Sequence, residues 1–591
     1  MGKMSASHFL HTIDSSLPRF EVPSSKISIL HRPSEFLDNL LSGIAAARRR
    51  IFLCSLYIGT DVPSVLAALQ ASLRTQPQLS LYILLDGLRS TRPGPDSDGS
   101  SRTTADILLP LVREFGTQRV VIRFYHTPSL RGIWKLVAPN RLNEGFGLQH
   151  IKLCGFDDDV MVTGANLSGE YFTNRQDRYY KFVDSPELVG YLFGFVTALG
   201  GFAYLISAAR CRFQGIEDGE RQERGFSLEW PATNHTSKPL EESDEATIRE
   251  AARRHLLPLM WNFSTSSNQD REKEKAVLRS REEADTVVYP LAQLAPLLGR
   301  TPNPQPRASS QSIPSTHEWV MTHLLSYLAH PEGNASWTLS TPYLSLTSQI
   351  QSWLDGINRF QNQPSSKAKS LPFYPSSEEK ETGIETQQTR KGAIIAAAPE
   401  AMSFYGASGL AGYIPRAFER EFAKLRAILD MDNDDNHNNN KLHSETKNQE
   451  QRGIIRLLQW RRGTAHEKEG WTFHAKGWWV KGVSSITKDH DMRDGNVGGG
   501  GGDEMAMTVI GSSNYGERSL KLDLEMDLLV VTRDKDLIRR MGCEEREFLR
   551  YGRGVGDGDG DLGEKGGWMG AVEGMVVWVL VMAIGLMGLS I

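Results

Sequence analysis

A histidine and a lysine two residues apart occur twice in this chain, as His150-x-Lys152 and His474-x-Lys476. On a β-strand, residues i and i+2 point to the same face, so each pair would face one pocket. An imidazole can attack phosphorus, and a lysine ammonium can stabilise the charge that develops on the phosphoryl oxygens. One such pair alone would indicate a buried strand with an ordinary histidine and lysine. Two pairs predict chemistry at a phosphate.

Further residues repeat in the same order after each pair. Asn166 follows the first pair and Asn514 follows the second. Asp177 lies eleven residues after Asn166, and Glu525 lies eleven residues after Asn514. Matched offsets of this kind indicate a duplicated catalytic unit. We expect the two asparagines to hold phosphoryl oxygens and the two carboxylates to fix the tautomer of a histidine. The spacing leaves open which carboxylate serves which histidine.

The first pair extends to a fuller pattern, HxKxxxxD, which ends at Asp157. Through this motif, present twice, the chain resembles the phospholipase D superfamily. The second copy departs from it at Lys481, where the superfamily usually has Asp, so the role of that position is open. Asp157 is a catalytic candidate by this motif, although its place in an acidic turn between two strands favours a role in the turn.

Within that superfamily, three segments resemble the eukaryotic phosphatidylglycerophosphate synthases: GANLSGEYFTNRQDRYYKF, LSTPYLSLTS and FHAKGWWV. Members of that family are CDP-diacylglycerol–glycerol-3-phosphate 3-phosphatidyltransferases, normally of mitochondria. The resemblance covers most of residues 20–215 and 316–550. It implies that CDP-diacylglycerol and glycerol-3-phosphate are the substrates, and that the enzyme works in mitochondria at a membrane surface. The first twenty residues are a poor presequence, so the expected location rests on the resemblance alone.

The resemblance also implies a mechanism through a phosphatidyl-histidine. His150 would attack the phosphorus that bears the diacylglycerol and release CMP. His474 would protonate the leaving group and then deprotonate the hydroxyl of glycerol-3-phosphate. Lys152 and Lys476 would hold the phosphoryl oxygens, so we expect no cofactor and no metal.

The acceptor carries a phosphate of its own, which calls for positive charge beyond the two lysines. Arg175 and Arg178 lie close to Asn166 in the sequence and are the candidates for this substrate-binding role. The alternative is that both arginines pair with nearby acids. Aromatic residues near the motifs, Tyr171 among them, are more often core than substrate contacts.

Other functions fit the duplicated motif. A phosphatidylserine synthase, a phospholipase D-type hydrolase or a nuclease would share it and differ in the acceptor. A nuclease should show basic grooves with aromatic side chains, which this sequence does not show, so we expect no nucleic-acid partner. A membrane-tethered binding protein with an inactive site is disfavoured because His, Lys and Asn are intact in both halves.

Alternating helices and strands must position these residues. Residues 34–50 and 62–76 have helical patterns, and the apolar runs 51–59 and 79–88 predict buried strands. In the second half, ASWTLSTPYLSLT and KGAIIAAAPEA repeat those strands. The pattern predicts an α/β fold of two pseudo-two-fold-related phospholipase D-like domains. Each would be a mixed sheet flanked by helices, with one shared active site at the interface.

The predicted organisation has five parts. They are an N-terminal segment (1–19), domain 1 (20–215), a polar insertion or linker (216–315), domain 2 with low-complexity insertions (316–550), and a Gly/Asp-rich linker with an apolar tail (551–591). Two apolar runs bear on membranes. We expect a buried or interfacial helix over residues 188–209 rather than a span, and a short C-terminal anchor over residues 574–591.

Composition sets only broad limits. The chain has 591 residues, a formal net charge of −4 and 39 % hydrophobic residues, which is ordinary for a globular protein of two or more domains. Its four cysteines have no CxxC spacing. That argues against a disulfide framework or a zinc site and fits a reducing compartment.

Overall fold

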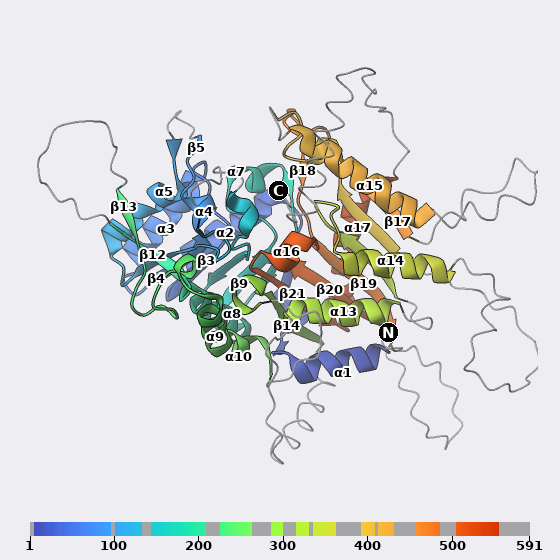
Figure 1. The fold of residues 1–591 in the computed structure, drawn as a ribbon, viewed down its shortest axis with the longest axis horizontal. Coiled ribbons are helices and arrows are strands. Elements are labelled where there is room, and N and C mark those ends of the chain that lie inside the picture. The colour runs from blue at the N-terminus through green and yellow to red at the C-terminus, as the bar shows by residue number, and fades with distance from the viewer. Residues whose placement is uncertain are drawn as a thin grey trace, which may run out of the picture.

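The fold is built on two large mixed sheets, one from residues 27–229 and the other from residues 286–554 with one short strand near the N-terminus (Figure 1). The computed structural model describes residues 5–95, 101–132, 143–208, 225–262, 285–299, 315–329, 335–361, 392–407, 412–430, 455–484 and 504–554. Each sheet has nine strands and is flanked by helices. The predicted α/β fold with two mixed sheets is therefore confirmed.

The first sheet contains the strands predicted around the first motif. Its order is β13 (Phe226–Glu229), β12 (Ala203–Ala208), β7 (Val120–Tyr125), β4 (Ser80–Asp86), β3 (Arg50–Cys54), β8 (Leu153–Phe156), β9 (Asp159–Thr163), β11 (Tyr179–Phe182) and β2 (Ile27–Leu30). β3, β4 and β7 run parallel, and the strands beyond β3 pair antiparallel. The parallel strands are almost continuous apolar runs because both of their faces are buried.

Eight strands of the second sheet repeat the order and directions of eight in the first, while the edge strands β13 and β1 (Phe20–Glu21) have no counterpart. The second sheet consists of β22 (Gly552–Gly554), β17 (Ile455–Trp460), β16 (Gly392–Ala397), β15 (Ser336–Ser340), β19 (Gly477–Ser484), β20 (Glu504–Gly511), β21 (Glu525–Thr532), β14 (Thr286–Gln293) and β1. The registers match as well, since Cys54 pairs with Leu153 in one sheet and Ser340 pairs with Gly477 in the other. The sheets thus preserve the duplication seen in the motifs.

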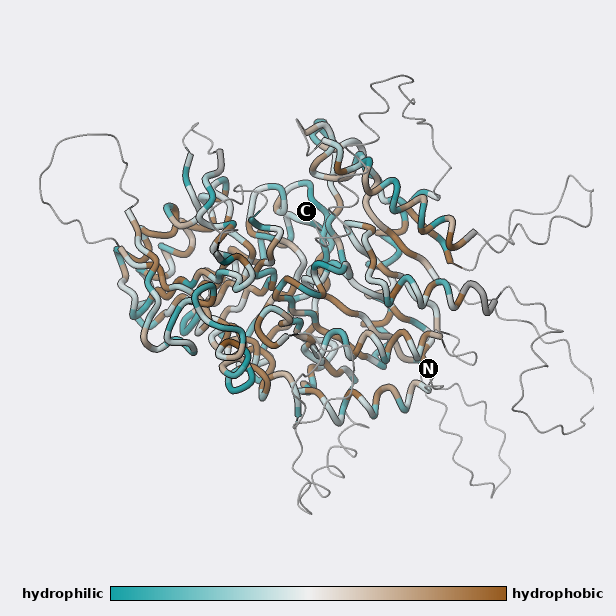
Figure 2. Tube along the Cα trace, viewed as in Figure 1, coloured by the Kyte–Doolittle hydropathy of each residue, from teal (hydrophilic) through white to brown (hydrophobic). Residues whose placement is uncertain are grey.

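Helices cover the sheets and close the cores. The larger ones are α2 (Pro33–Ala46), α3 (Pro63–Thr75), α5 (Thr104–Phe115), α8 (Pro186–Gly200), α13 (Thr316–Leu328), α14 (Ser348–Gln361), α15 (Ile414–Asp430) and α17 (Lys535–Arg550). One apolar core lies between the first sheet and α2, α3 and α5. A second core continues from the first sheet through α8 into the second sheet, and it joins the halves. The central strands of both sheets are largely apolar (Figure 2).

The remaining elements are short, apart from α1 and α9. They are α1 (Ala6–Ser16), α4 (Gly87–Ser90), α7 (Gly169–Thr173), α9 (Glu245–His255), α10 (Leu257–Met260), α12 (Ala295–Leu298), α16 (Glu517–Lys521), β5 (Gly94–Pro95), β6 (Ser101–Arg102), β10 (Arg175–Gln176) and β18 (Thr472–Phe473). Single 3₁₀ turns cover Ser24–Lys26, Asn143–Phe146, Leu240–Glu242 and Pro399–Ala401.

The apolar run at 188–209 divides into two elements. Its first part belongs to α8, whose side chains Leu192 and Phe195 are fully buried, so the expected buried helix is confirmed there. After Gly200 and Gly201 the chain turns into the strand β12, which ends at Ala208. Within the ranges described, no helix is long and apolar enough to cross a membrane. The predicted anchor at 574–591 lies outside the described residues.

The linker prediction for residues 216–315 is wrong in part. β14 pairs with β21 along its whole length and lies inside the second sheet. The average composition of residues 216–315 is polar, so it did not indicate this apolar strand of eight residues. The N-terminal segment is also part of the fold, since Phe9 of α1 is buried and stacks on Tyr327 of α13.

Candidate active site

The two HxK motifs lie where the two halves of the chain meet. The short strands β10 and β18 pair in parallel, and the amide of His474 donates to the Gln176 carbonyl at 2.8 Å. The equivalent bond in the other half runs from the His150 amide to the Leu524 carbonyl at 2.9 Å. Each motif directly precedes its strand, β8 or β19, rather than lying within it. In each half, the amide of the motif histidine is thus bonded to a carbonyl of the opposite half. This symmetric arrangement brings both motifs to one interface, as the duplication predicts.

Glu525, from the second half, orients His150. Both carboxylate oxygens of Glu525 lie 3.0 Å from the Nδ1 atom of His150. The Nδ1–H group therefore donates to the carboxylate, and the lone pair of Nε2 faces the site. Within the part of the chain that the structure describes, no residue is hydrogen-bonded to this Nε2 atom. His150 thus has the geometry of a nucleophile.

Asp177, from the first half, orients His474. Its Oδ2 atom lies 2.7 Å from the Nδ1 atom of His474. The other ring nitrogen, Nε2, lies 3.1 Å from the hydroxyl of Tyr171. Each histidine is therefore supported by the carboxylate of the opposite half, which answers the question that the sequence left open.

Burial and the neighbouring lysines keep both imidazoles neutral in the free site. Burial first, and then Lys152, hold the pKa of His150 well below its usual value. Burial and Lys476 do the same to the pKa of His474. Burial raises the pKa of Glu525, whereas Lys152 beside it lowers that pKa and favours the carboxylate form. A neutral imidazole is the form that attacks phosphorus or accepts a proton.

The two lysines are buried beside the histidines. Lys152 donates to the carbonyl of His150 at 2.6 Å, and burial lowers the pKa of Lys152 to about 7. Lys476 donates to the Gly164 carbonyl at 3.3 Å and lies 3.5 Å from Asp177. It also lies 2.8 Å from Nδ1 of His474, but that nitrogen donates its proton to Asp177, so the contact is not a further hydrogen bond. A bound phosphate anion would favour the charged form of both lysines.

A glycine makes this close arrangement possible. A Cβ atom on Gly164 would lie 2.6 Å from both the Asp177 Oδ1 atom and the Lys476 Nζ atom. Any larger residue would displace the carboxylate or the ammonium. The residues described include no group of three or more His, Cys, Asp and Glu side chains that could hold a metal ion.

The two asparagines each leave a polar atom unsatisfied. Asn166 donates from Nδ2 to the Tyr171 hydroxyl at 3.2 Å. The Oδ1 atoms of Asn166 and Asn514 are buried, and no described residue is hydrogen-bonded to them. Leaving a buried polar atom unpaired costs about 1–3 kcal/mol, so such atoms indicate the place of a ligand. The amide of Asn514, turned by 180°, would present its NH₂ donors there instead, whereas the Asn166 amide keeps Nδ2 on the Tyr171 hydroxyl.

Asp157 has a structural role, so its assignment to the catalytic set is wrong. Its carboxylate accepts from the backbone amides of Arg48, Arg49 and Arg50 at 2.8–2.9 Å. It lies in the turn between β8 and β9, with a φ of 51°. Lys481, at the same position of the second motif, is half-buried on β19 and forms an ion pair with Glu545. Neither side chain contacts the catalytic histidines.

The two arginines differ. Arg178 is fully buried and donates to the Glu544 carboxylate at 2.8 and 2.9 Å and to the Val509 carbonyl at 2.9 Å. This burial is inconsistent with the predicted substrate-binding role of Arg178, and the alternative of pairing with an acid holds for it. Arg175 pairs with Glu170 but lies over the ring of Tyr171, with 4.7 Å between the guanidinium carbon and the ring centroid. Arg175 remains a candidate for binding substrate.

Two further residues contact the paired histidine and carboxylate side chains, and they were not among the predicted site residues. Tyr171 reaches Nε2 of His474, and Ser519 donates to Oε1 of Glu525 at 2.7 Å. Each lies five residues after the asparagine of its half, Asn166 or Asn514. The shared offset was the signal that could have identified them.

Known proteins resemble this chain over most of its length. No family model matches the chain. The CDP-diacylglycerol–glycerol-3-phosphate 3-phosphatidyltransferase of Saccharomyces cerevisiae is 31 % identical over 554 residues, which cover 93 % of this chain and 87 % of the yeast protein. The Homo sapiens protein of the same name, described as mitochondrial, is 30 % identical over 558 residues, 92 % of this chain and 81 % of its own.

A solved structure shows the same fold. The phosphatidylserine synthase of Haemophilus influenzae aligns with a TM-score of 0.57 over 98 % of this chain and 97 % of its own, at 15 % identity. That likeness concerns the fold alone, whereas the sequence relatives match this chain over most of its length and of their own. The chain shares its fold with that phosphatidylserine synthase, and it belongs to the family of CDP-diacylglycerol–glycerol-3-phosphate 3-phosphatidyltransferases.

Proposed function

We propose that this chain transfers the phosphatidyl group of CDP-diacylglycerol to glycerol-3-phosphate and releases CMP. The observation that carries the proposal is the pair of buried histidines at one interface, each in contact with a carboxylate of the opposite half. Two such histidines can divide a displacement at phosphorus into two steps. The family of the chain supports the choice of donor and acceptor.

In the first step, Nε2 of His150 attacks the phosphorus that bears the diacylglycerol. A phosphorus–nitrogen bond forms, and the bond to the CMP oxygen breaks. His474 gives a proton to the departing CMP, since a bound diphosphate favours the imidazolium form of His474. Glu525 accepts from Nδ1–H and stabilises the positive charge on the phosphatidyl-histidine.

In the second step, the hydroxyl of glycerol-3-phosphate attacks the same phosphorus. Nε2 of His474 takes the hydroxyl proton, and the bond to His150 breaks. Lys152 and Lys476 hold the non-bridging oxygens in both steps because the negative charge on them grows as each bond forms. The two asparagines supply further polar contacts to these oxygens.

An apolar groove gives the lipid part of the donor a place. A groove of about 370 Å³ lies between α14 and α15, and it is lined by Leu344, Leu346, Gln351, Glu421, Lys424, Leu425, Ala427 and Ile428. Next to Leu344, the ring of Tyr343 lies 6.5 Å from the ring of His474 and 5.4 Å from the ring of Phe418 on α15. A residue adjacent in sequence to the groove lining thus lies near His474, and we assign the groove to one acyl chain of CDP-diacylglycerol.

The expected location follows from the substrate and the relatives. CDP-diacylglycerol resides in a bilayer, so the enzyme works at a membrane surface. Mammalian relatives are described as mitochondrial, which supports the same compartment for this chain. The apolar residues 574–591 are the proposed anchor.

The acceptor test decides among the functions. Purified protein is given CDP-diacylglycerol in detergent with glycerol-3-phosphate, serine or water as acceptor, in the presence of EDTA. We expect phosphatidylglycerophosphate and an equal amount of CMP, because this chain's own lysines supply the positive charge. Phosphatidylserine as the better product would assign the chain to the phosphatidylserine synthases. Phosphatidic acid as the main product with every acceptor would identify a hydrolase, and no product from folded protein would identify a binding protein.

Filling the groove should weaken binding of long-chain donors. Ala427 lines the groove from an exposed position, so Ala427→Trp should raise the KM for a long-chain donor about tenfold, equivalent to about two buried methylenes. A donor with short acyl chains should be affected much less. Ala423→Trp, at an exposed position of the same helix that does not line the groove, is the matched control. Equal effects of the two substitutions, or an effect independent of chain length, would contradict the assignment.

A further inference from the structure

We propose that the hydroxyl of Tyr171 guards Nε2 of His474 against water and so directs the phosphatidyl-histidine to its acceptor rather than to hydrolysis. The inference rests on the proposed function and concerns the same site. In this role Tyr171 is a positioning residue, since it acts through His474.

The hydrogen bonds around Tyr171 have a defined direction. Nδ1–H of His474 donates to Asp177, so Nε2 carries the lone pair. The hydroxyl of Tyr171, 3.1 Å away, therefore donates to Nε2. Its oxygen accepts from Nδ2 of Asn166 at 3.2 Å, which leaves the phenol proton pointing at the histidine. The lone pair that must take a proton in the second step is thus occupied in the free site.

Packing holds the phenol ring in this position. Tyr171 is 2 % exposed and meets the ring of His474 edge-on, with 5.0 Å between the centroids. The guanidinium of Arg175 lies over the ring of Tyr171, with 4.7 Å between the guanidinium carbon and the ring centroid. Burial raises the pKa of Tyr171, so the group stays a hydroxyl and a donor near neutral pH.

Among the described residues, a hydroxyl bonded to Nε2 is found at His474 and not at His150. In the second half, the residue at the offset of Tyr171 is Ser519, whose hydroxyl is bonded to Glu525 and not to a ring nitrogen. His150, the nucleophile, has its Nε2 atom open toward the substrate. Of the two motif histidines, His474 alone has the hydroxyl of a described residue on its Nε2 atom. His474 is the base that activates the acceptor, so water would compete with the acceptor at this atom.

Hydrolysis and transfer use the same bonds. In hydrolysis, a water oxygen bonds to phosphorus, the bond from phosphorus to Nε2 of His150 breaks, and one water proton moves to Nε2 of His474. Water must first displace the Tyr171 hydroxyl from Nε2 of His474. A water molecule has no remote group that could bind the protein and offset the lost hydrogen bond. Glycerol-3-phosphate is held by its own phosphate, and binding energy from that remote group offsets the displacement. Arg175, whose guanidinium lies over the ring of Tyr171, is the candidate cation for that phosphate.

The test is the ratio of phosphatidic acid to phosphatidylglycerophosphate at saturating glycerol-3-phosphate. Tyr171→Phe keeps the ring and its packing and removes only the hydroxyl. We expect the ratio to rise about tenfold or more. Tyr57→Phe is the matched control, because the Tyr57 hydroxyl is also half-buried near the site but bonds to Ser168, 3.2 Å away, and its loss should leave the ratio unchanged.

Two outcomes would overturn the proposal. One is an unchanged ratio in folded Tyr171→Phe, and the other is an equal rise in Tyr57→Phe. If Tyr171→Phe does not fold, Tyr171→Met, which also lacks a hydroxyl, must raise the ratio. A purely structural role would lower total turnover without changing the ratio. Failure of the proposed function is recognised separately, because the unsubstituted protein would then make no phosphatidylglycerophosphate.

Discussion

Replacing either motif histidine, as His150→Ala or His474→Ala, should lower phosphatidyl transfer by on the order of a thousandfold or more. In the proposed mechanism both side chains act in sequence on one phosphoryl group, and residues that act as a unit show losses of this size when one is removed. Each histidine is oriented by a buried carboxylate, at 3.0 Å for His150 and 2.7 Å for His474, so no other described imidazole can replace it. Turnover is measured as CMP release with both substrates present.

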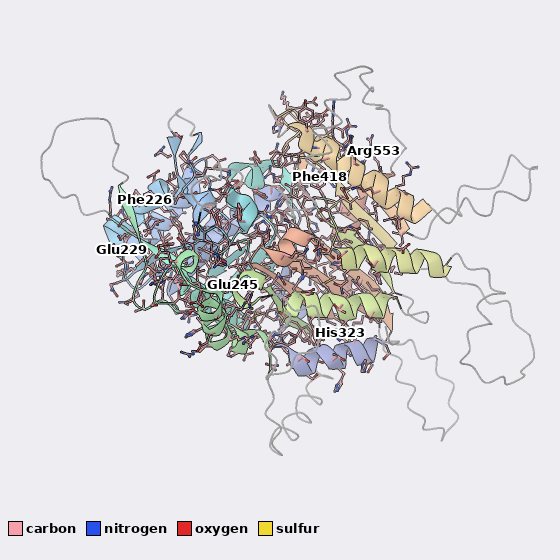
Figure 3. The ribbon with its side chains drawn as sticks, in the orientation of Figure 1. Phe226, Glu229, Glu245, His323, Phe418 and Arg553 are labelled. Atoms are coloured by element: carbon pink, nitrogen blue, oxygen red, sulfur yellow. The ribbon has the colours of Figure 1, made fainter. Side chains whose placement is uncertain are left out.

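The two variants should differ in the covalent step. With CDP-diacylglycerol labelled at the phosphatidyl phosphorus, His150→Ala should carry no label after rapid quenching. His474→Ala should become labelled slowly and keep the label when glycerol-3-phosphate is added, because the base for the second step is absent. His323→Ala is the control, since His323 lies on α13, belongs to neither motif and bonds to the Trp319 carbonyl (Figure 3). Retention of about a tenth of the activity by either motif variant would refute the shared site.

Removing the charge of either supporting carboxylate should lower phosphatidyl transfer nearly as much as removing a motif histidine. Asp177→Asn and Glu525→Gln keep the shape of the side chain but no longer fix the Nδ1–H tautomer. In a serine protease the corresponding change lowers turnover about 10⁴-fold, and we expect a loss on the order of a thousandfold here. The control is Asp157→Asn, which should lower thermal stability through the β8–β9 turn and leave most of the turnover.

Each carboxylate supports the histidine of the opposite half, so the losses in Asp177→Asn and Glu525→Gln should fall on different steps. Glu525 supports the nucleophile His150, so Glu525→Gln should slow formation of the labelled intermediate. Asp177 supports His474, so Asp177→Asn should slow its consumption by glycerol-3-phosphate, and the label should accumulate. Accumulation in Glu525→Gln instead would mean that His474 is the nucleophile. Accumulation in neither variant would contradict a covalent intermediate.

Much of the fold and of the reactive set was predictable from local spacing. The two HxK pairs and the eleven-residue intervals to Asp177 and Glu525 identified the duplicated unit. Apolar runs such as 79–88 predicted buried strands, because a strand with both faces covered has few polar positions. These features depend on neighbours within a dozen residues, and periodicity records such neighbours directly.

The tertiary structure alone decided how the parts combine. His474 and Asp177 are 297 residues apart, and His150 and Glu525 are 375 apart, so no local pattern could assign the pairs. The same packing placed Arg178 in the core against Glu544, although its sequence neighbours suggested a substrate site. It also brought Tyr171 to the reactive nitrogen of His474. Each of these contacts exists because two similar sheets meet at a pseudo-two-fold interface, where side chains from one half complete the site of the other.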